Sequence, residues 1–491
     1  MNYILAIDQG TSSTRAMIYT LHGELVTSSQ YSLTQYYPNL GWVEHDPEEI
    51  WEKTLKAMKD VVSQVPGKLI LCCGITNQRE TTVIWNRNTG VCLAPAIVWQ
   101  DRRTEKFCSS LAEYSLEIQE KTGLIPDPYF SASKLNWLLK NISQAQSLLN
   151  KGDLAFGTID SFLIWRMTKG LKHSTDITNA SRTMLFNINN EKWDQELLKL
   201  FSIPESVLPE VYPSDNHFGV INKDWLGMEI PITGVAGDQQ AALIGQGCFN
   251  DGMVKATFGT GGFLLLNTGN KPVLSQHKLL TTIAYKIKEK TVYGLEGSIY
   301  HAGTTVKWLR DELKLISHSS ETESLAASLE SNNGVYLVSS FTGLGAPHWI
   351  STSGTAIIGL SRSTNRAHIA RAALEGVCYQ TREVLACMRD DSQLDLTLLK
   401  ADGGMAANQW FLQFLADQCQ LKIQKPKDIE TSAKGAAILS AIGYGLFDSF
   451  SAINKVWDVE QEFQPSRNKE DVEKDFRGWL GALSMVKTGQ V

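Results

Sequence analysis

The chain has 491 residues, which exceeds the usual size of one compact hydrophobic core, so its length predicts two domains. Hydrophobic residues make up 43% of it and charged residues 20%, as in globular proteins in water. The formal net charge of -6 argues against nucleic acid and anionic membranes as partners. Because no apolar run approaches the roughly 20 residues that span a bilayer, and no secretory leader is recognisable, we expect a cytoplasmic protein that binds small molecules.

The first predicted element is a β-hairpin with a polar turn. Two apolar, β-branched runs, residues 4–7 and 16–19, predict buried strands joined by a tight reversal at residues 9–11. Asp8 ends the first strand, where an unpaired carboxylate is costly, so a cation or hydrogen-bond donors are expected nearby. The amides and hydroxyls of the turn and the guanidinium of Arg15 suit phosphate oxygens. Ordinary polar turns have the same composition, so the hairpin alone leaves both interpretations open.

Apolar strands alternate with amphipathic helices along the chain, which predicts an α/β protein. Residues 48–62 have the periodicity of a helix, and residues 69–76 form a run typical of a buried strand. The eight cysteines lack a C-x-x-C spacing, so we expect reduced thiols rather than a zinc site or disulfides. The glycine-rich stretch at residues 245–252 is the predicted boundary between domains 1–247 and 248–491.

A second strand, Gly-Thr turn and strand at residues 254–266 repeat the design of the first hairpin. This repetition suggests that one α/β unit is duplicated, with the two turns facing each other across a cleft. Gly403 and Gly404 form a third glycine cluster before an amphipathic helix, where a partly negative ligand can approach the backbone. Neither a P-loop nor a dinucleotide-binding glycine pattern occurs, so a different phosphate clamp is expected.

Several motifs together are characteristic of a known family: DQGTSSTR (8–15), GWVEHDPEEIW (41–51), ITNQRETTVIW (75–85), GDQQAALIGQ (237–246), FGTGG (258–262) and DGGMAAN (402–408). Over about residues 3–460 the chain resembles the FGGY carbohydrate kinases of the actin-like ATPase superfamily, and within them the members that phosphorylate glycerol. The resemblance implies an α/β fold with two actin-like (ribonuclease H-like) ATPase domains related by duplication and an interdomain cleft. It also implies phosphoryl transfer from ATP to glycerol, with magnesium, by a homodimer or homotetramer.

The resemblance also implies which residues bind the nucleotide. The two phosphate loops and the adenosine segments would contribute Thr11, Ser12, Ser13, Arg15, Thr260, Gly303, Gly404 and Asn408. Asp8 matches the acid that holds magnesium, through water because this ion keeps much of its hydration. Lys307 replaces a Gln of some relatives and has no assigned role. Glu229 stands where an Arg is expected in relatives that fructose 1,6-bisphosphate inhibits, so we expect little inhibition of this chain.

For the acceptor, the resemblance makes Asp238, after the apolar run 231–237, the general base on the attacking hydroxyl. The residues implied to contact glycerol are Arg79, Glu80, Trp99, Tyr129, Asp238, Gln239 and Phe263. In isolation, an Arg-Glu dipeptide is more typical of a surface ion pair, and Trp and Phe are more often core residues.

Two alternatives stay open from the sequence. The same superfamily contains filament proteins and chaperones that hydrolyse ATP without a small acceptor, although no residues remain here for a peptide-binding domain. Within the kinases, the acceptor could instead be a pentose, a pentulose or gluconate. An assay against a panel of polyols and sugars distinguishes these possibilities.

Overall fold

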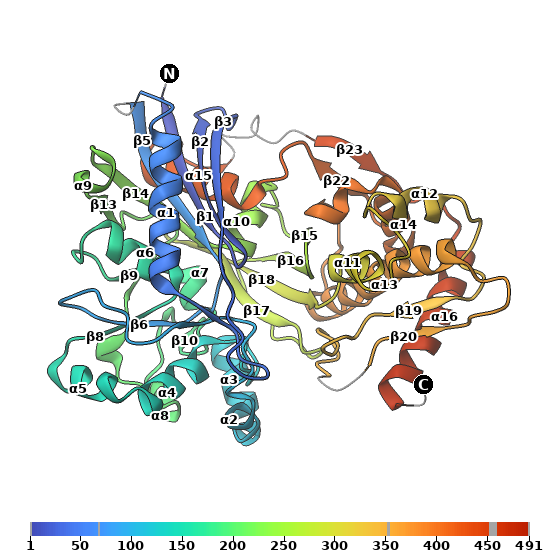
Figure 1. Ribbon diagram of the computed structural model, residues 1–491, viewed down its shortest axis with the longest axis horizontal. Helices are drawn as coiled ribbons and strands as arrows, with labels where there is room; N and C mark the ends of the chain where they lie inside the picture. Colours follow the sequence, from blue (N-terminus) through green and yellow to red (C-terminus); the bar gives the residue numbers. More distant parts are fainter. Residues whose placement is uncertain (1, 67–68, 351–353, 451–458, 490–491) are drawn as a thin grey trace.

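The computed structural model describes residues 2–66, 69–350, 354–450 and 459–489. Its helices and strands form two α/β lobes, each built around one large sheet (Figure 1). No helix in these ranges combines the length and hydrophobicity that crossing a membrane requires. The predicted α/β fold class is confirmed.

The first lobe contains a six-stranded sheet. Across the sheet the strands are β13 (Gly219–Ile221), β14 (Ile230–Gly237), β5 (Ile70–Asn77), β1 (Tyr3–Gln9), β2 (Ser13–Thr20) and β3 (Leu25–Ser32). Strand β1 is antiparallel to β2 and parallel to β5, which is in turn parallel to β14. The predicted first hairpin is therefore β1–β2, and the predicted helix of residues 48–62 is α1 (Pro47–Val62).

The second lobe repeats this connectivity in a seven-stranded sheet. Its strands are β17 (Leu280–Ile287), β18 (Lys290–Ile299), β16 (Gly262–Gly269), β15 (Met253–Phe258), β21 (Leu398–Asp402), β22 (Ile423–Pro426) and β23 (Val459–Phe463). Strand β15 is antiparallel to β16 and parallel to β21, which is parallel to β22. In both sheets, therefore, the first strand of a hairpin pairs with a parallel strand, which in turn pairs with a second parallel strand, as expected from duplication.

The remaining elements cover the sheets or form small ones beside them. Those of the first lobe are β4 (Glu44–His45), β6 (Val83–Asn86), β7 (Ala96–Ile97), α2 (Glu105–Ser109), α3 (Ser115–Thr122), α4 (Ser131–Asn141), α5 (Ser143–Lys151), β8 (Leu154–Gly157), α6 (Ile159–Met167), β9 (Ser174–Asp176), α7 (Ile177–Ala180), β10 (Phe186–Asn187), β11 (Lys192–Trp193), α8 (Gln195–Leu200), β12 (Glu210–Tyr212), α9 (Lys223–Leu226) and α10 (Asp238–Gly245). The others are α11 (Gly303–Asp311), α12 (Glu321–Ala327), β19 (Tyr336–Val338), β20 (Ala356–Ile358), α13 (Arg366–Ser392), α14 (Gln409–Cys419), α15 (Thr431–Gly443) and α16 (Lys469–Thr488).

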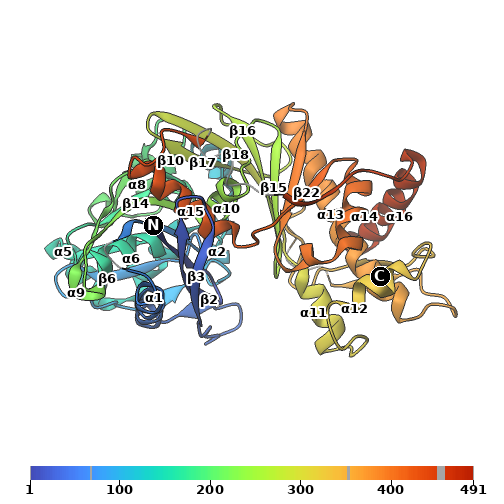
Figure 2. The ribbon, with the colours of Figure 1, turned by 90° about the horizontal axis from the view of Figure 1, so that it is seen from above.

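Helix α15 comes from the second half of the sequence but packs on the first lobe, against α10, β5 and β14. Figure 2 shows it there, apart from α14 and α16. Glycines allow this close approach: a Cβ on Gly245 would lie 1.8 Å from the Thr431 carbonyl oxygen, and one on Gly435 would lie 1.9 Å from that of Ala241. The division that we propose after residue 247 falls between α10 and β15, and α15 crosses back over it.

Candidate active site

The turn between β1 and β2 forms the first predicted phosphate loop. The Gly10 amide donates to the Ser13 carbonyl at 2.9 Å and closes the turn, and Ser12 is exposed at its tip. The Thr11 hydroxyl accepts a hydrogen bond from the Trp99 indole Nε1 at 2.9 Å. The loop is therefore joined directly to one of the aromatic residues predicted to cover the acceptor.

Charged groups surround the start of this loop. Burial raises the pKa of Asp8 to about 7, opposed by Arg15 and reinforced by the carboxylates of Asp238 and Glu430. Arg15 forms an ion pair with Glu430, immediately before α15. Two further carboxylates thus act on Asp8, and Arg15 is the cation that opposes them there. A divalent cation would offset the negative charge that gathers at Asp8.

The donor set at Asp8 fits magnesium. Among the described residues, no group of three or more His, Cys, Asp or Glu side chains is arranged to hold a metal. Magnesium does not need such a cage, because it is usually bound through one or two carboxylates, water and the phosphates of the substrate.

The second predicted phosphate loop lies between β15 and β16 and is fixed by the start of α11. Thr260 is exposed, and its carbonyl accepts from the amides of Ala302 and Thr304, each at 3.1 Å. The Gly303 amide donates to the Gly259 carbonyl at 2.9 Å, and a Cβ on Gly303 would lie 2.5 Å from the same oxygen. The absent side chain of Gly303 therefore makes room for the loop itself, and its predicted contact with adenosine stays a prediction.

The third glycine cluster, Gly403 and Gly404, leads into a 3₁₀ turn at Gly404–Ala407. The predicted amphipathic helix, α14, starts after this turn, at Gln409. A Cβ on Gly404 would meet nothing within 4 Å, so this exposed glycine borders open space. The Asn408 side chain accepts from the Phe411 amide at 2.9 Å as the N-cap of α14, and it also donates to the Thr322 hydroxyl at 3.3 Å. Gly404 is therefore placed to let a ligand approach, whereas Asn408 already has structural partners.

Asp238 follows β14 directly and is the first residue of α10, at the strand end that the sequence predicts. Its carboxylate lies 3.3 Å from the Arg79 Nε and accepts from the Gln239 amide at 2.7 Å. The side chain keeps 29% of its surface exposed, although Arg79 beside it is buried. A carboxylate at a helix N-terminus is electrostatically favoured, and this one remains accessible to a small acceptor.

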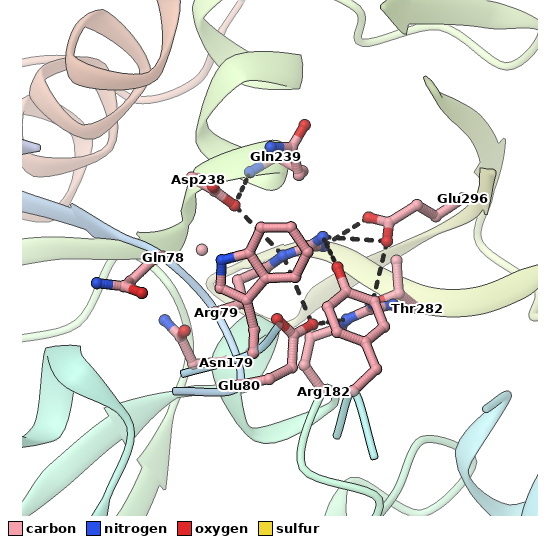
Figure 3. A network of polar contacts seen from close by, with 12 residues as sticks. Gln78, Arg79, Glu80, Asn179, Arg182, Asp238, Gln239, Thr282 and Glu296 are labelled. Atoms are coloured by element: carbon pink, nitrogen blue, oxygen red, sulfur yellow. Dashed lines mark hydrogen bonds and ion pairs between the residues drawn. The ribbon is translucent and has the colours of Figure 1, made fainter. Parts of the chain in front are cut away.

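Arg79 lies at the centre of a buried ionic network (Figure 3). Glu296 of β18 binds both terminal nitrogens of its guanidinium, at 2.6 and 3.0 Å. The Gln240 amide oxygen and the Tyr129 hydroxyl accept from the same nitrogens at 3.2 and 3.3 Å. Since Nε faces Asp238, the donors of Arg79 all have protein acceptors near them, and an incoming hydroxyl must compete with Asp238 or Tyr129.

Glu80 is also buried, which excludes the surface ion pair that this dipeptide suggests in isolation. Its carboxylate accepts from the Arg182 Nε at 2.6 Å, and the terminal nitrogen of Arg182 donates to Glu296 at 2.9 Å. Two arginines and two glutamates thus alternate in one cluster that joins the lobes.

The three predicted aromatic residues meet beside this cluster. The Trp99 ring centroid lies 5.5 Å from that of Tyr129 and 6.0 Å from that of Phe263. Trp99 and Tyr129 belong to the first lobe, whereas Phe263 is on β16 of the second, and all three remain partly exposed. They therefore form a wall with an accessible face rather than a closed core.

Sequence reasoning missed three charged residues of the site: Arg182, Lys255 and Glu296. Lys255 lies on β15 and donates to the Gln239 side-chain oxygen. The available signal was a lone charge within an otherwise apolar strand, VKATF for Lys255 and YGLEGSI for Glu296. Such a charge is expensive to bury and so marks a position that needs a specific partner.

A surface hollow of about 850 Å³ lies elsewhere, with Tyr36, Val91 and Arg166 among its lining residues. Arg166 forms an ion pair with Glu48 there and donates to the Gly90 carbonyl at 2.9 Å. None of the predicted site residues lines this hollow, so it is separate from the phosphate loops.

Comparison with known proteins agrees with this arrangement. The model of the FGGY family of carbohydrate kinases, N-terminal domain, matches residues 3–245, and that of the C-terminal domain matches residues 254–444. The chain belongs to the FGGY family of carbohydrate kinases. A glycerol kinase of Coxiella burnetii (strain RSA 331 / Henzerling II) is 50% identical over 99% of this chain and 98% of its own length. A glycerol kinase of Gluconobacter oxydans (strain 621H) is 49% identical over 99% of this chain and 95% of its own length.

Solved structures of this family have the same fold. The crystal structure of Plasmodium falciparum glycerol kinase with ADP superimposes with a TM-score of 0.94 at 39% identity, covering 99% of this chain and 98% of that one. A ligand-bound xylulose kinase from Lactobacillus acidophilus superimposes with a TM-score of 0.90 at 21% identity, covering 99% of each chain. At that identity the second match supports the two-domain fold alone.

Proposed function

We propose that this protein transfers the γ-phosphoryl group of ATP to glycerol and so forms sn-glycerol 3-phosphate. The observation that carries the proposal is the position of Trp99. Its indole N–H is bonded to Thr11 of the first phosphate loop, and its ring contacts Tyr129 and Phe263. The groups that we assign to the phosphates and to the acceptor are therefore adjacent, as transfer between two bound substrates requires. The identity of about 50% with curated glycerol kinases supports glycerol as the acceptor.

In the proposed reaction, Asp238 takes the proton of the attacking hydroxyl. Its exposed carboxylate at the start of α10 is anchored by Arg79, which Glu296 holds in turn. A general base of this kind contributes about 10²–10⁴-fold to the rate. The remainder comes from alignment of the substrates and from electrostatic stabilisation.

Donors on both loops would hold the phosphates. Ser12 and Thr260 are exposed at the two turns, and Arg15 is on β2, which follows the first turn. Asp8 would hold magnesium through water. When bound, this ion supplies neutralisation of the charge that develops on the transferred phosphoryl group.

The test is ATP-dependent phosphorylation of glycerol by the purified protein, compared with its Asp238→Asn variant. We expect turnover to fall by at least about 10²-fold in the variant, because the amide cannot accept the proton. Binding of ADP, measured by calorimetry, should change by less than about threefold. A variant that keeps most of the glycerol-dependent rate would remove Asp238 from this role.

A further inference from the structure

Lys255 brings an ammonium group from the second sheet to the acceptor site. The residue lies on β15 and its side chain is completely buried. The Nζ donates to the Gln239 Oε1, to the Thr257 hydroxyl at 3.1 Å and to the Phe263 carbonyl at 3.3 Å. Gln239 belongs to α10 of the first lobe, so Lys255 connects the two lobes at the acceptor site.

The surroundings of this lysine are unusual for a buried cation, because its three hydrogen-bond acceptors are all uncharged. Burial lowers the pKa of Lys255 to about 8, opposed by the carboxylates of Asp402 and Asp238. An apolar residue would occupy a buried strand at lower cost, so the ammonium group itself requires an explanation.

The chemistry of the ammonium group supplies one. A lysine can only donate hydrogen bonds, so the Gln239 amide must turn its oxygen toward Lys255. The amide nitrogen of Gln239, with two donor hydrogens, then points away from Lys255. The bond from the same Nζ to the Phe263 carbonyl fixes the backbone that carries the aromatic ring.

We propose that Lys255 is a positioning residue for the acceptor, which sets Gln239 as a hydrogen-bond donor and holds the Phe263 side of the aromatic wall. The proposal rests on the proposed function, because Gln239 and Phe263 are residues that the family resemblance assigns to glycerol. It extends that function by making one buried cation of the second lobe responsible for acceptor recognition in the first.

Replacing Lys255→Met keeps an unbranched apolar side chain that reaches as far as the lysine Cε, and it removes the ammonium group with its three donors. The Gln239 amide is then free to rotate, so we expect kcat/KM for glycerol to fall by at least about tenfold. The KM for ATP should stay within about threefold, because Lys255 contacts neither predicted phosphate-loop threonine.

A matched control lies on the neighbouring strand. Lys400 of β21 is the register partner of Lys255, and its Nζ donates to the Gln246 carbonyl rather than to Gln239. Lys400→Met removes a partly buried cation from the same sheet, so kcat/KM for glycerol should stay within about threefold of the unaltered value. An equal loss in both variants would show a general effect of charge or stability and would overturn the proposal.

A double-mutant cycle separates positioning from a structural role. In a Gln239→Leu background, Lys255→Met should cost less in kcat/KM for glycerol than it does in the unaltered protein, because the amide to be oriented is absent and, of the two positioning bonds, only that to the Phe263 carbonyl is still lost. Additive losses would overturn the proposal, as would unchanged kcat/KM in Lys255→Met.

Should Lys255→Met fail to fold, a second pair of variants tests the proposal. Lys255→Gln can still donate to Gln239 and is expected to keep more activity than Lys255→Ala. If the unaltered protein does not phosphorylate glycerol, the proposed function itself fails, whatever the variants show.

Discussion

Arg79 and Arg182 are both buried, and Glu296 is the carboxylate that bonds to each of them. Burial by itself would raise the pKa of Glu296, but the two guanidinium groups overcome this effect and lower it to about 2. A glutamate that remains ionised inside the protein keeps Arg79 in one orientation, and Arg79 in turn holds Asp238. The proposed general base is therefore positioned by a residue of the opposite lobe.

Replacing Glu296→Gln should lower the free energy of unfolding by about 3–5 kcal/mol, because two buried arginines lose their shared counter-ion. Since the folded pKa lies below the ordinary value, this stabilisation is complete above about pH 5 and is lost as the pH falls through 2. Denaturant unfolding at pH 7 measures the difference. As a control, Glu460→Gln removes an exposed carboxylate that is paired with the partly buried Lys425, and it should cost about 0–1 kcal/mol. Similar losses in both variants would contradict the importance of the buried network.

Among the elements, α10 and α15 have the closest contact at the proposed site. Gly435 of α15 faces the Ala241 carbonyl, and α10 begins with Asp238, so any displacement of α15 moves the proposed general base.

Local patterns predicted both hairpins and α1, because each depends on residues near one another in sequence. The return of α15 to the first lobe depends on contacts with β5 and β14, which come far earlier in the sequence. Such contacts cannot be predicted from a local sequence pattern.

A substitution of Gly435→Ala tests this contact. The added Cβ would lie 1.9 Å from a backbone oxygen, so the helices must separate, and we expect a loss of about 1–3 kcal/mol in stability. The midpoint temperature of thermal unfolding and the glycerol-dependent rate should both fall. Gly481→Ala in α16 is the matched control: its Cβ meets nothing within 4 Å, and the substitution should be neutral or stabilise by about 0.4–1 kcal/mol. If Gly435→Ala behaves like this control, the close packing of α10 on α15 is not needed for activity.

On the scale of the whole molecule, the proposed acceptor site is assembled from both lobes. Arg79, Trp99 and Asp238 come from the first, whereas Phe263 and Glu296 come from the second. The family motifs named all of these residues except Glu296 as candidates, and the structure brings them close together. They did not predict that the donors of Arg79 would face other protein groups, because that depends on how Glu296 meets Arg79 across the lobes. A lone charge in an apolar strand indicates that Glu296 needs a partner, but the sequence pattern does not say which residue on the other lobe that partner is.

The acceptor specificity of the purified protein tests the central proposal most directly. With ATP and magnesium, kcat/KM should be compared for glycerol, xylitol, xylulose and gluconate. A longer acceptor must displace Trp99 or Phe263, or leave buried polar groups unpaired at about 1–3 kcal/mol each. Glycerol should therefore be preferred by roughly 10–10⁴-fold. A higher kcat/KM for xylulose or gluconate than for glycerol would contradict glycerol as the acceptor, even though the kinase fold would be unaffected.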